Sequence, residues 1–244
     1  MNFSSWELTL AVIGALFVGV SKTGVGGLGV LASALFVLLM PAKQSAGFVL
    51  PMLIFGDLVA VASYRRHAVW AHIGRMFPWT ALGIVFGWLA MGHMDDRQAR
   101  LLIGALVLGL TGLQVARRCL GADGAAPGAW FGPVIGVLAG FTTLVANAAG
   151  ALMAIYLLAM RLPKLEFVGT AAVFFLAVNL FKVPFMVHLG LLTTKSLQFN
   201  LWLAPAVFAG TLGGRWLLPR LNQRTFENVT LALGTLAGLY LLLK

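Results

Sequence analysis

Ten apolar runs follow one another along the chain, with only short polar stretches between most of them. They cover residues 8–20, 27–40, 45–63, 70–92, 97–116, 130–146, 149–160, 165–188, 197–218 and 225–243. The hydrocarbon core of a bilayer is about 30 Å thick, so a helical crossing needs roughly 20 apolar residues. Six of the runs reach or approach that length. Because a helix satisfies its own backbone hydrogen bonds in lipid, the pattern predicts an all-α fold, a polytopic bundle of transmembrane helices.

The composition excludes the other broad classes of protein. Of the 244 residues, 60% are hydrophobic and 10% are charged, whereas about 25% are charged in an average soluble domain. The single cysteine, Cys119, cannot form a disulfide scaffold within one chain. The net charge of +10 is dispersed among the loops and forms no basic stripe. We therefore expect membrane lipid around the protein and no nucleic-acid partner.

The four short runs form two pairs, and each pair flanks a break in the apolar sequence. Runs 8–20 and 27–40 flank Ser21–Gly27, and runs 130–146 and 149–160 flank Val145–Ala148. Short segments in corresponding positions of two halves are typical of discontinuous helices in transporters. We therefore expect a broken or re-entrant pair of short helices in each half of the chain.

The two halves of the sequence resemble each other. A shift of 122 residues pairs Pro41 with Pro163, Gly47 with Gly169 and Asp57 with Asn179, and a shift of 127 residues then pairs Gly83 with Gly210 and Arg97 with Arg224. Matches of proline, glycine and Asp/Asn in register are unexpected by chance, so the pattern indicates an internal duplication. It predicts a first membrane repeat at 1–118, a cytoplasmic linker at 119–129 and a second membrane repeat at 130–244.

The basic loop residues indicate the orientation of the repeats. If each half crosses the membrane an odd number of times, the repeats are inverted and both termini lie outside. This arrangement places ten basic residues inside: Lys22, Arg65, Arg66, Arg75, Arg117, Arg118, Arg161, Lys164, Arg220 and Arg224. Five lie outside: Lys43, Arg97, Arg100, Lys195 and Lys244. Because cytoplasmic loops carry the excess of Lys and Arg, the bias favours inverted over parallel repeats.

Polar side chains inside the apolar runs are candidates for function, since a charge at membrane depth costs roughly 2.5–3.5 kcal/mol. Lys22 and Asn147 lie in the two breaks, Asp57 lies in the third run, and Asn179 and Lys182 lie in the eighth. We expect these lysines and asparagines to contact a small anionic substrate. Asp57 is the candidate for carrying a proton or for pairing with Lys22 or Lys182.

The breaks also offer backbone donors. An interrupted helix leaves N–H groups without intrahelical partners and has a positive dipole end. Two such N-termini that face each other form an anion site. The predicted substrate-binding set therefore includes Thr23, Gly24, Gly26 and Gly27 at the first break and Ala148 at the second.

The same residues also allow interpretations in which they have no role in transport. Lys22 and Lys182 lie near enough to run ends to extend toward the interface, and Asp57 and Asn179 can act as polar contacts between helices. The segment Gly24–Gly29 satisfies G-x-G-x-x-G, but the preceding run reads as a membrane helix, whereas a dinucleotide site needs a preceding strand. We find no metal-ligand spacing and no catalytic motif, and expect no cofactor, no metal and no enzymatic activity.

At these residues the sequence resembles the TauE/SafE family of sulfite and organosulfonate exporters. The resemblance covers nearly the whole chain. It rests on the glycine-rich break Gly24–Gly29 and on two matching stretches, Met40-Pro41-Ala42-Lys43-Gln44-Ser45-Ala46-Gly47 and Leu162-Pro163-Lys164-Leu165-Glu166-Phe167-Val168-Gly169. The second break departs from the family's longer glycine run and reads Ala146-Asn147-Ala148-Ala149-Gly150.

The resemblance implies a transporter of small sulfur-containing anions. Together with the residues above, it predicts a secondary transporter in the bacterial inner membrane that moves sulfite, an organosulfonate or a related anion by alternating access, with H+ as a candidate coupling ion. A passive anion channel and a membrane scaffold without transport remain as alternatives.

Overall fold

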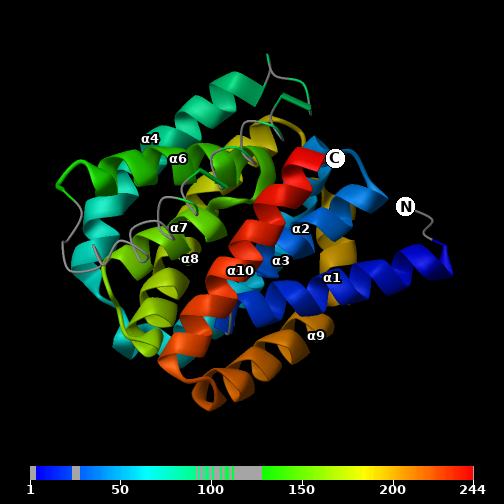
Figure 1. Ribbon diagram of the computed structural model, residues 1–244. Coiled ribbons are helices and arrows are strands. Elements are labelled where there is room, and N and C mark those ends of the chain that lie inside the picture. Colours follow the sequence, from blue (N-terminus) through cyan, green and yellow to red (C-terminus); the bar gives the residue numbers. More distant parts are fainter. Residues whose placement is uncertain are drawn as a thin grey trace.

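The described part of the chain is helical, and it contains no strand (Figure 1). The computed structural model describes residues 4–23, 28–91 and 128–243, together with isolated positions between 93 and 112. The helices are α1 (Ser5–Thr23), α2 (Leu28–Leu39), α3 (Ala42–Tyr64), η1 (Arg65–His67), α4 (Trp70–Met91), α6 (Phe131–Ala146), α7 (Ala149–Ala159), α8 (Lys164–His188), α9 (Thr194–Leu217), η3 (Leu218–Arg220) and α10 (Gln223–Leu243). The predicted all-α class is confirmed.

Several of these helices are long and apolar enough to cross a membrane. Within the described residues, five segments qualify: Ser5–Thr23, Lys43–His67, Trp70–Met91, Lys164–His188 and Thr194–Arg220. Helices α6 and α7 are apolar but shorter, at 16 and 11 residues. The outer surface carries large apolar side chains such as Trp70 and Leu201, which are 65% and 74% exposed. The chain is therefore a multi-pass membrane protein, as predicted.

The first break is narrower than the sequence suggested. We expected Ser21, Lys22 and Thr23 to be unwound, and the first run to be short. Instead these residues form the last turn of α1, which is 19 residues long and qualifies as a span. Nothing in the sequence Ser-Lys-Thr forbids a helix, because residues with little helical preference are tolerated where glycine and proline are not. The second break is likewise confined to Asn147 and Ala148.

Prolines mark the start of the two central helices. Pro41 precedes α3 and Pro163 precedes α8, and both have extended backbone, with ψ angles of 142° and 150°. A proline pre-sets its own φ and disfavours a helical conformation in the residue before it. The two matching stretches of sequence therefore begin two equivalent helices, which pack against each other in the centre of the bundle.

The same close contact between helices occurs twice, and each time it joins a helix of the first half to a helix of the second. Helix α9 lies along α1, and α4 lies along α6 (Figure 1). A Cβ atom on Gly210 of α9 would overlap the backbone carbonyl of Leu16, and a Cβ atom on Gly83 of α4 would overlap that of Val137. The two glycines are related by the 127-residue shift found in the sequence. Small residues let membrane helices approach closely, so the equivalent glycines serve equivalent contacts.

The buried apolar core divides between the two sides of the bundle. One cluster joins α3, α4, α6, α7 and α8, and a second cluster joins α1, α2, α3 and α9. Helix α3 contributes to both, since Leu50 belongs to the first and Met52 to the second. Asp57 and Asn179 lie near the middle of α3 and α8, and both are buried. The fold therefore brings the polar positions of the two halves into the interior.

Candidate functional site

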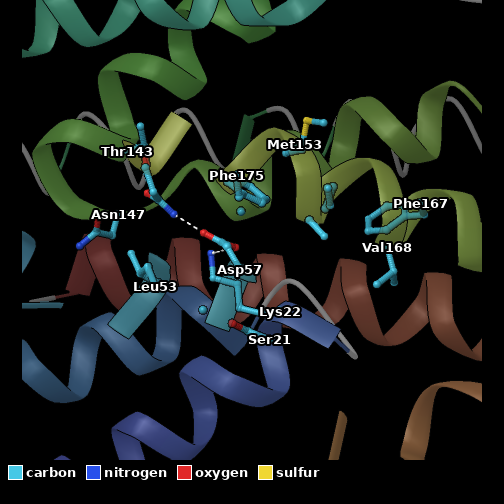
Figure 2. A pocket seen from close by; sticks show the side chains of 16 residues that line it. Ser21, Lys22, Leu53, Asp57, Thr143, Asn147, Met153, Phe167, Val168 and Phe175 are labelled. Carbon is cyan, nitrogen blue, oxygen red and sulfur yellow. Dashed lines mark hydrogen bonds and ion pairs between the residues drawn. The ribbon is translucent and has the colours of Figure 1, made fainter. Parts of the chain in front are cut away.

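Residues that flank the first break and Asn147 in the second break line one cavity in the interior of the bundle (Figure 2). Its lining consists of Ser21, Lys22, Gly29, Leu53, Asp57, Thr143, Asn147, Gly150, Met153, Ala154, Phe167, Val168, Ala171, Ala172, Phe175 and Asn179. The cavity volume is about 50 Å³, and one water needs about 10–15 Å³. The space holds a few waters or one small solute.

An ion pair joins two of the residues that line the cavity. The Nζ atom of Lys22, in the last turn of α1, lies 2.7 Å from Oδ1 of Asp57 on α3. The aspartate side chain is fully buried, and that of Lys22 is 9% exposed. The ammonium also lies 4.9 Å from the centroid of the Phe175 ring, within the distance of a cation–π contact. Pairing satisfies the carboxylate, which would otherwise be an isolated charge in the interior.

Asn179 is the second partner of the Asp57 carboxylate. Its Nδ2 atom donates to Oδ2 of Asp57 across 2.6 Å. The two residues occupy equivalent positions in the two halves, since they are 122 residues apart. Equivalent positions on the two central helices therefore meet each other, with an acid from one half and an amide from the other.

Lys182 binds residues of the second break and takes no part in the Lys22–Asp57 ion pair. Its Nζ atom donates to the carbonyl oxygen of Thr143 at 2.8 Å, to Oγ1 of Thr143 at 3.3 Å and to Oδ1 of Asn147 at 2.6 Å. An ammonium has three N–H donors and no acceptor, so these oxygens match its capacity. Thr143 lies in the last turn of α6, where the helix dipole favours a cation. Lys182 is fully buried and is not among the residues that line the cavity.

Asn147 has a backbone conformation suited to a break. Its φ is 54° and its ψ is 30°, in the left-handed region, and it forms the C-cap of α6. Asparagine tolerates this region better than most residues. Its Nδ2 atom donates to the carbonyl oxygen of Ala46 on α3 at 3.1 Å, while its Oδ1 atom accepts from Lys182. The side chain thus links the break to the central helices of both halves.

The first turns of the two helices that follow the breaks, α2 and α7, also line the cavity. Gly29 lies in the first turn of α2, and Gly150 lies in the first turn of α7. Ala148, the N-cap of α7, provides no side-chain cap, and its own N–H donates to the carbonyl oxygen of Thr142. First-turn N–H groups have no intrahelical partner and favour negative charge. The first turns of α2 and α7 therefore border the cavity that Lys22 also lines.

The remaining predicted residues are placed as follows. Thr23 is buried, and its hydroxyl donates to the carbonyl oxygen of Thr211 on α9 at 2.6 Å. Its side chain therefore joins α1 to α9 in this structure. Gly24, Gly26 and Gly27 lie outside the described residues.

The apolar part of the lining was missed by the sequence analysis. Phe167, Val168, Ala171, Phe175 and Asn179 lie on one face of α8 and line the cavity. Phe167, Ala171, Phe175 and Asn179 recur every four residues, and Val168 lies three residues before Ala171, as expected for a single helix face. This spacing was the available signal, since it places aromatic and aliphatic residues on the same stripe as the polar Asn179.

These features define a class of protein: a multi-pass membrane protein with a small charged cavity between its helices. No group of three or more His, Cys, Asp or Glu side chains in the described part of the chain is placed to hold a metal ion. Charged and polar groups buried in this way mark the path of a solute or ion in membrane proteins.

Residues 11–241 match the family described as Sulfite exporter TauE/SafE. The chain therefore belongs to this family, which confirms the resemblance found in the sequence. Membership implies a membrane exporter of sulfite or related sulfur compounds. No curated protein and no solved structure shows a significant match to the chain.

Proposed function

We propose that the protein is a secondary transporter that moves a small sulfur-containing anion, such as sulfite or an organosulfonate, across the bacterial inner membrane. The observation that carries the proposal is the single cavity lined by residues beside both breaks, with Lys22 and first-turn residues of α2 and α7 on its wall. A cation and two helix N-termini give an oxyanion both charge and hydrogen-bond donors. Asn147 and Asn179 supply further amide groups to this wall.

Alternating access is supported by an asymmetry between the two central helices. On α8 the cavity is lined from Phe167 to Asn179. The shift of 122 residues maps this stretch onto 45–57 of α3, where only Leu53 and Asp57 line the cavity. Ala46 and Leu50 are buried there against other side chains. The cavity thus extends along one repeat and is closed along the other, as expected for one of two states related by exchange of the repeats.

The proposal includes the domain organisation. The repeats are residues 1–118 and 130–244, inverted with respect to the membrane and joined by a cytoplasmic linker at 119–129. Support comes from the equivalent contacts of Gly83 and Gly210 and from the meeting of Asp57 with Asn179. The paired segments α1/α2 and α6/α7 are then the broken or re-entrant elements of the two repeats.

Asp57 is the proposed site of proton coupling. Its carboxylate is held by Lys22 and Asn179 within the cavity where the anion binds. An anion that approaches Lys22 competes with this carboxylate for the ammonium. A carboxylate that loses its cation in the interior is stabilised by taking up a proton. Binding of the anion and protonation of Asp57 are therefore linked.

Flux into proteoliposomes tests the proposal. The purified protein is reconstituted, and uptake of sulfite is followed with and without a pH gradient. A transporter gives saturable uptake that the Lys22→Ala variant lacks, and coupling at Asp57 makes uptake respond to the gradient in wild type but not in Asp57→Asn. Flux that neither saturates nor responds to pH would favour a passive channel. Absence of flux for every sulfur anion, with intact protein, would favour a scaffold.

A further inference from the structure

The packing of the helices divides the bundle into two bodies that differ from the two sequence repeats. Helix α9 shares a buried core with α1, α2 and α3, whereas α4 shares a buried core with α6, α7 and α8. We call the first group the α9 body and the second group the α4 body. Each body thus contains one long helix from the other half of the chain, as the course of α9 along α1 shows (Figure 1). The two bodies meet where the central helices α3 and α8 pack against each other.

Close backbone contacts make each body rigid. A Cβ atom on Gly19 of α1 would overlap the carbonyl oxygen of Val207 on α9, and one on Gly140 of α6 would overlap that of Thr80 on α4. These contacts are equivalent, because Gly19 and Gly140 are 121 residues apart and Thr80 and Val207 are 127 residues apart. Each helix pair therefore has backbone contacts through glycines of both partners. Such closely packed helices move together.

Two lysines bind across the boundary between the bodies. Lys43, the second residue of α3, donates from Nζ to the carbonyl oxygen of Met91, the last residue of α4, at 2.9 Å. Lys164, the first residue of α8, donates from Nζ to three carbonyl oxygens that follow α9, those of Leu218 at 3.4 Å, Pro219 at 3.3 Å and Leu221. In both cases the start of a central helix is joined to the end of the long helix that lies in the other body.

The two lysine contacts are equivalent in the duplicated sequence. Met91 and Leu218 are 127 residues apart, which is the shift that relates α4 to α9. The shift of 122 residues maps Lys43 onto Leu165, the neighbour of Lys164, so the two lysines differ by one position. The same carbonyl is therefore bound by a lysine of the same helix turn in each half.

Neither lysine is placed to stabilise its own helix. Lys43 and Lys164 lie in the first turns of α3 and α8, where the helix dipole disfavours a cation. The last carbonyl groups of a helix have no intrahelical partner and favour a cation. The position of each lysine is therefore explained by the helix end that it binds in the other body.

The two contacts lie at opposite ends of the cavity. Phe167, at the end of the lining on α8, is three residues from Lys164. Asn147 lines the cavity and donates to the carbonyl oxygen of Ala46, which is three residues from Lys43. In the inverted arrangement proposed above, Lys164 faces the cytoplasm and Lys43 faces the opposite side. A solute that enters or leaves by either route passes one of these contacts.

From these observations we propose that Lys43 and Lys164 are positioning residues for transport, a pair of equivalent latches that join the α9 body to the α4 body at opposite faces of the membrane. The bodies rock about the contact of α3 with α8, and one latch opens while the other stays closed. The Lys164 ammonium releases the carbonyls after α9 when the cavity opens to the cytoplasm, and the Lys43 ammonium releases Met91 when it opens to the other side. The inference rests on the proposed alternating access and specifies the parts that move.

Accessibility of the cavity from each face tests the latches. In a chain with Cys119→Ser, the reporter Ala171→Cys places a thiol on the cavity wall. Its rate of reaction with an impermeant maleimide is measured in inside-out and in right-side-out vesicles. We expect Lys164→Met to raise the rate from the cytoplasmic face roughly tenfold, and Lys43→Met to raise the rate from the opposite face by a similar factor. Loss of a hydrogen bond to a charged group shifts an equilibrium by about this factor or more.

Matched variants separate a latch from a general role in folding. Lys164→Arg and Lys43→Arg keep a cation with several donors, and we expect their labelling rates to stay within about twofold of the reporter chain. Lys195→Met removes the same charge from the first turn of α9, where the side chain is exposed, and should change neither rate. A variant that is merely destabilised would label faster from both faces, so opposite effects of Lys43→Met and Lys164→Met report the latches themselves.

The outcomes distinguish the latches from the proposed function. Rates that stay unchanged in both methionine variants, or rise from the same face in both, overturn the latches, and sulfite flux by the wild-type protein still supports transport. If the two variants expose the cavity to opposite faces while no sulfur anion is transported, the latches stand and the proposed function fails. Opposite exposure together with sulfite flux supports both.

Discussion

Lys22 and Asp57 form a buried ion pair, with Nζ 2.7 Å from Oδ1. One residue ends the helix before the first break, and the other lies inside a central helix. Removal of one partner leaves the other as an uncompensated charge, which typically destabilises a protein by about 3–5 kcal/mol. We therefore expect Lys22→Ala to lower the thermal unfolding temperature as well as to abolish anion flux.

A double variant separates these two effects. In Lys22→Ala/Asp57→Ala both charges are absent, so we expect most of the lost stability to return while flux stays at background. Thermal unfolding of the purified protein and sulfite uptake by proteoliposomes give the two readouts. A Lys22→Ala variant with wild-type unfolding temperature and wild-type flux would falsify the role of the pair.

Lys182 gives a second prediction, because its ammonium binds the end of α6 rather than a carboxylate. Lys182→Ala leaves no acid without a cation, so folding and membrane insertion should persist. The side chain of Asn147 and the carbonyl of Thr143 lose their shared donor, and the break loses its fixed geometry. We expect transport to be abolished.

Leu180→Ala is the control for this variant. Leu180 lies two residues away on the same helix, and its side chain is 51% exposed. Its truncation should leave flux unchanged. Normal transport by Lys182→Ala, measured at equal amounts of inserted protein, removes Lys182 from the mechanism.

Inverted repeats make a prediction about the two faces of the membrane. Arg66 lies in η1 after α3, and Lys195 lies in the first turn of α9 after α8; both are exposed. With the sole cysteine, Cys119, replaced by serine, a cysteine is introduced at one position at a time. In the inverted arrangement an impermeant maleimide labels Arg66→Cys from the cytoplasmic side and Lys195→Cys from the opposite side. Labelling of both from the same side contradicts inversion and favours parallel repeats.

Much of the fold follows from properties that are local in the sequence. Apolar runs of about 20 residues predict α3, α4, α8 and α9 to within a few residues. Pro41 and Pro163 mark the starts of the central helices for a steric reason that needs no tertiary information. The unwound stretches were placed less well, because a polar turn such as Ser21-Lys22-Thr23 is compatible with a helix when other helices pack around it.

The site was harder to predict because its partners come from distant parts of the chain. The sequence singles out Lys22, Asp57 and Asn179 as polar residues in apolar runs, but only the packing of α1, α3 and α8 decides that they meet. It also does not distinguish Lys182, which faces the end of α6, from Lys22, which lines the cavity. The sequence shows which polar residues are costly to bury in a membrane. Which partner each of them binds depends on how the helices pack.

The equivalent glycine contacts give the last prediction, with controls on the same helices. Gly210→Ala and Gly83→Ala each place a Cβ against a backbone carbonyl of a neighbouring helix. A backbone carbonyl cannot move aside as a flexible side chain can, so we expect a loss of about 2 kcal/mol or more in stability. Gly213 on α9 and Gly74 on α4 have nothing within 4 Å of an added Cβ. Alanine there should leave the unfolding temperature unchanged or raise it slightly, because alanine is the better helix former. Equal unfolding temperatures for Gly210→Ala and Gly213→Ala would show that the backbones of α1 and α9 are not in close contact at Gly210.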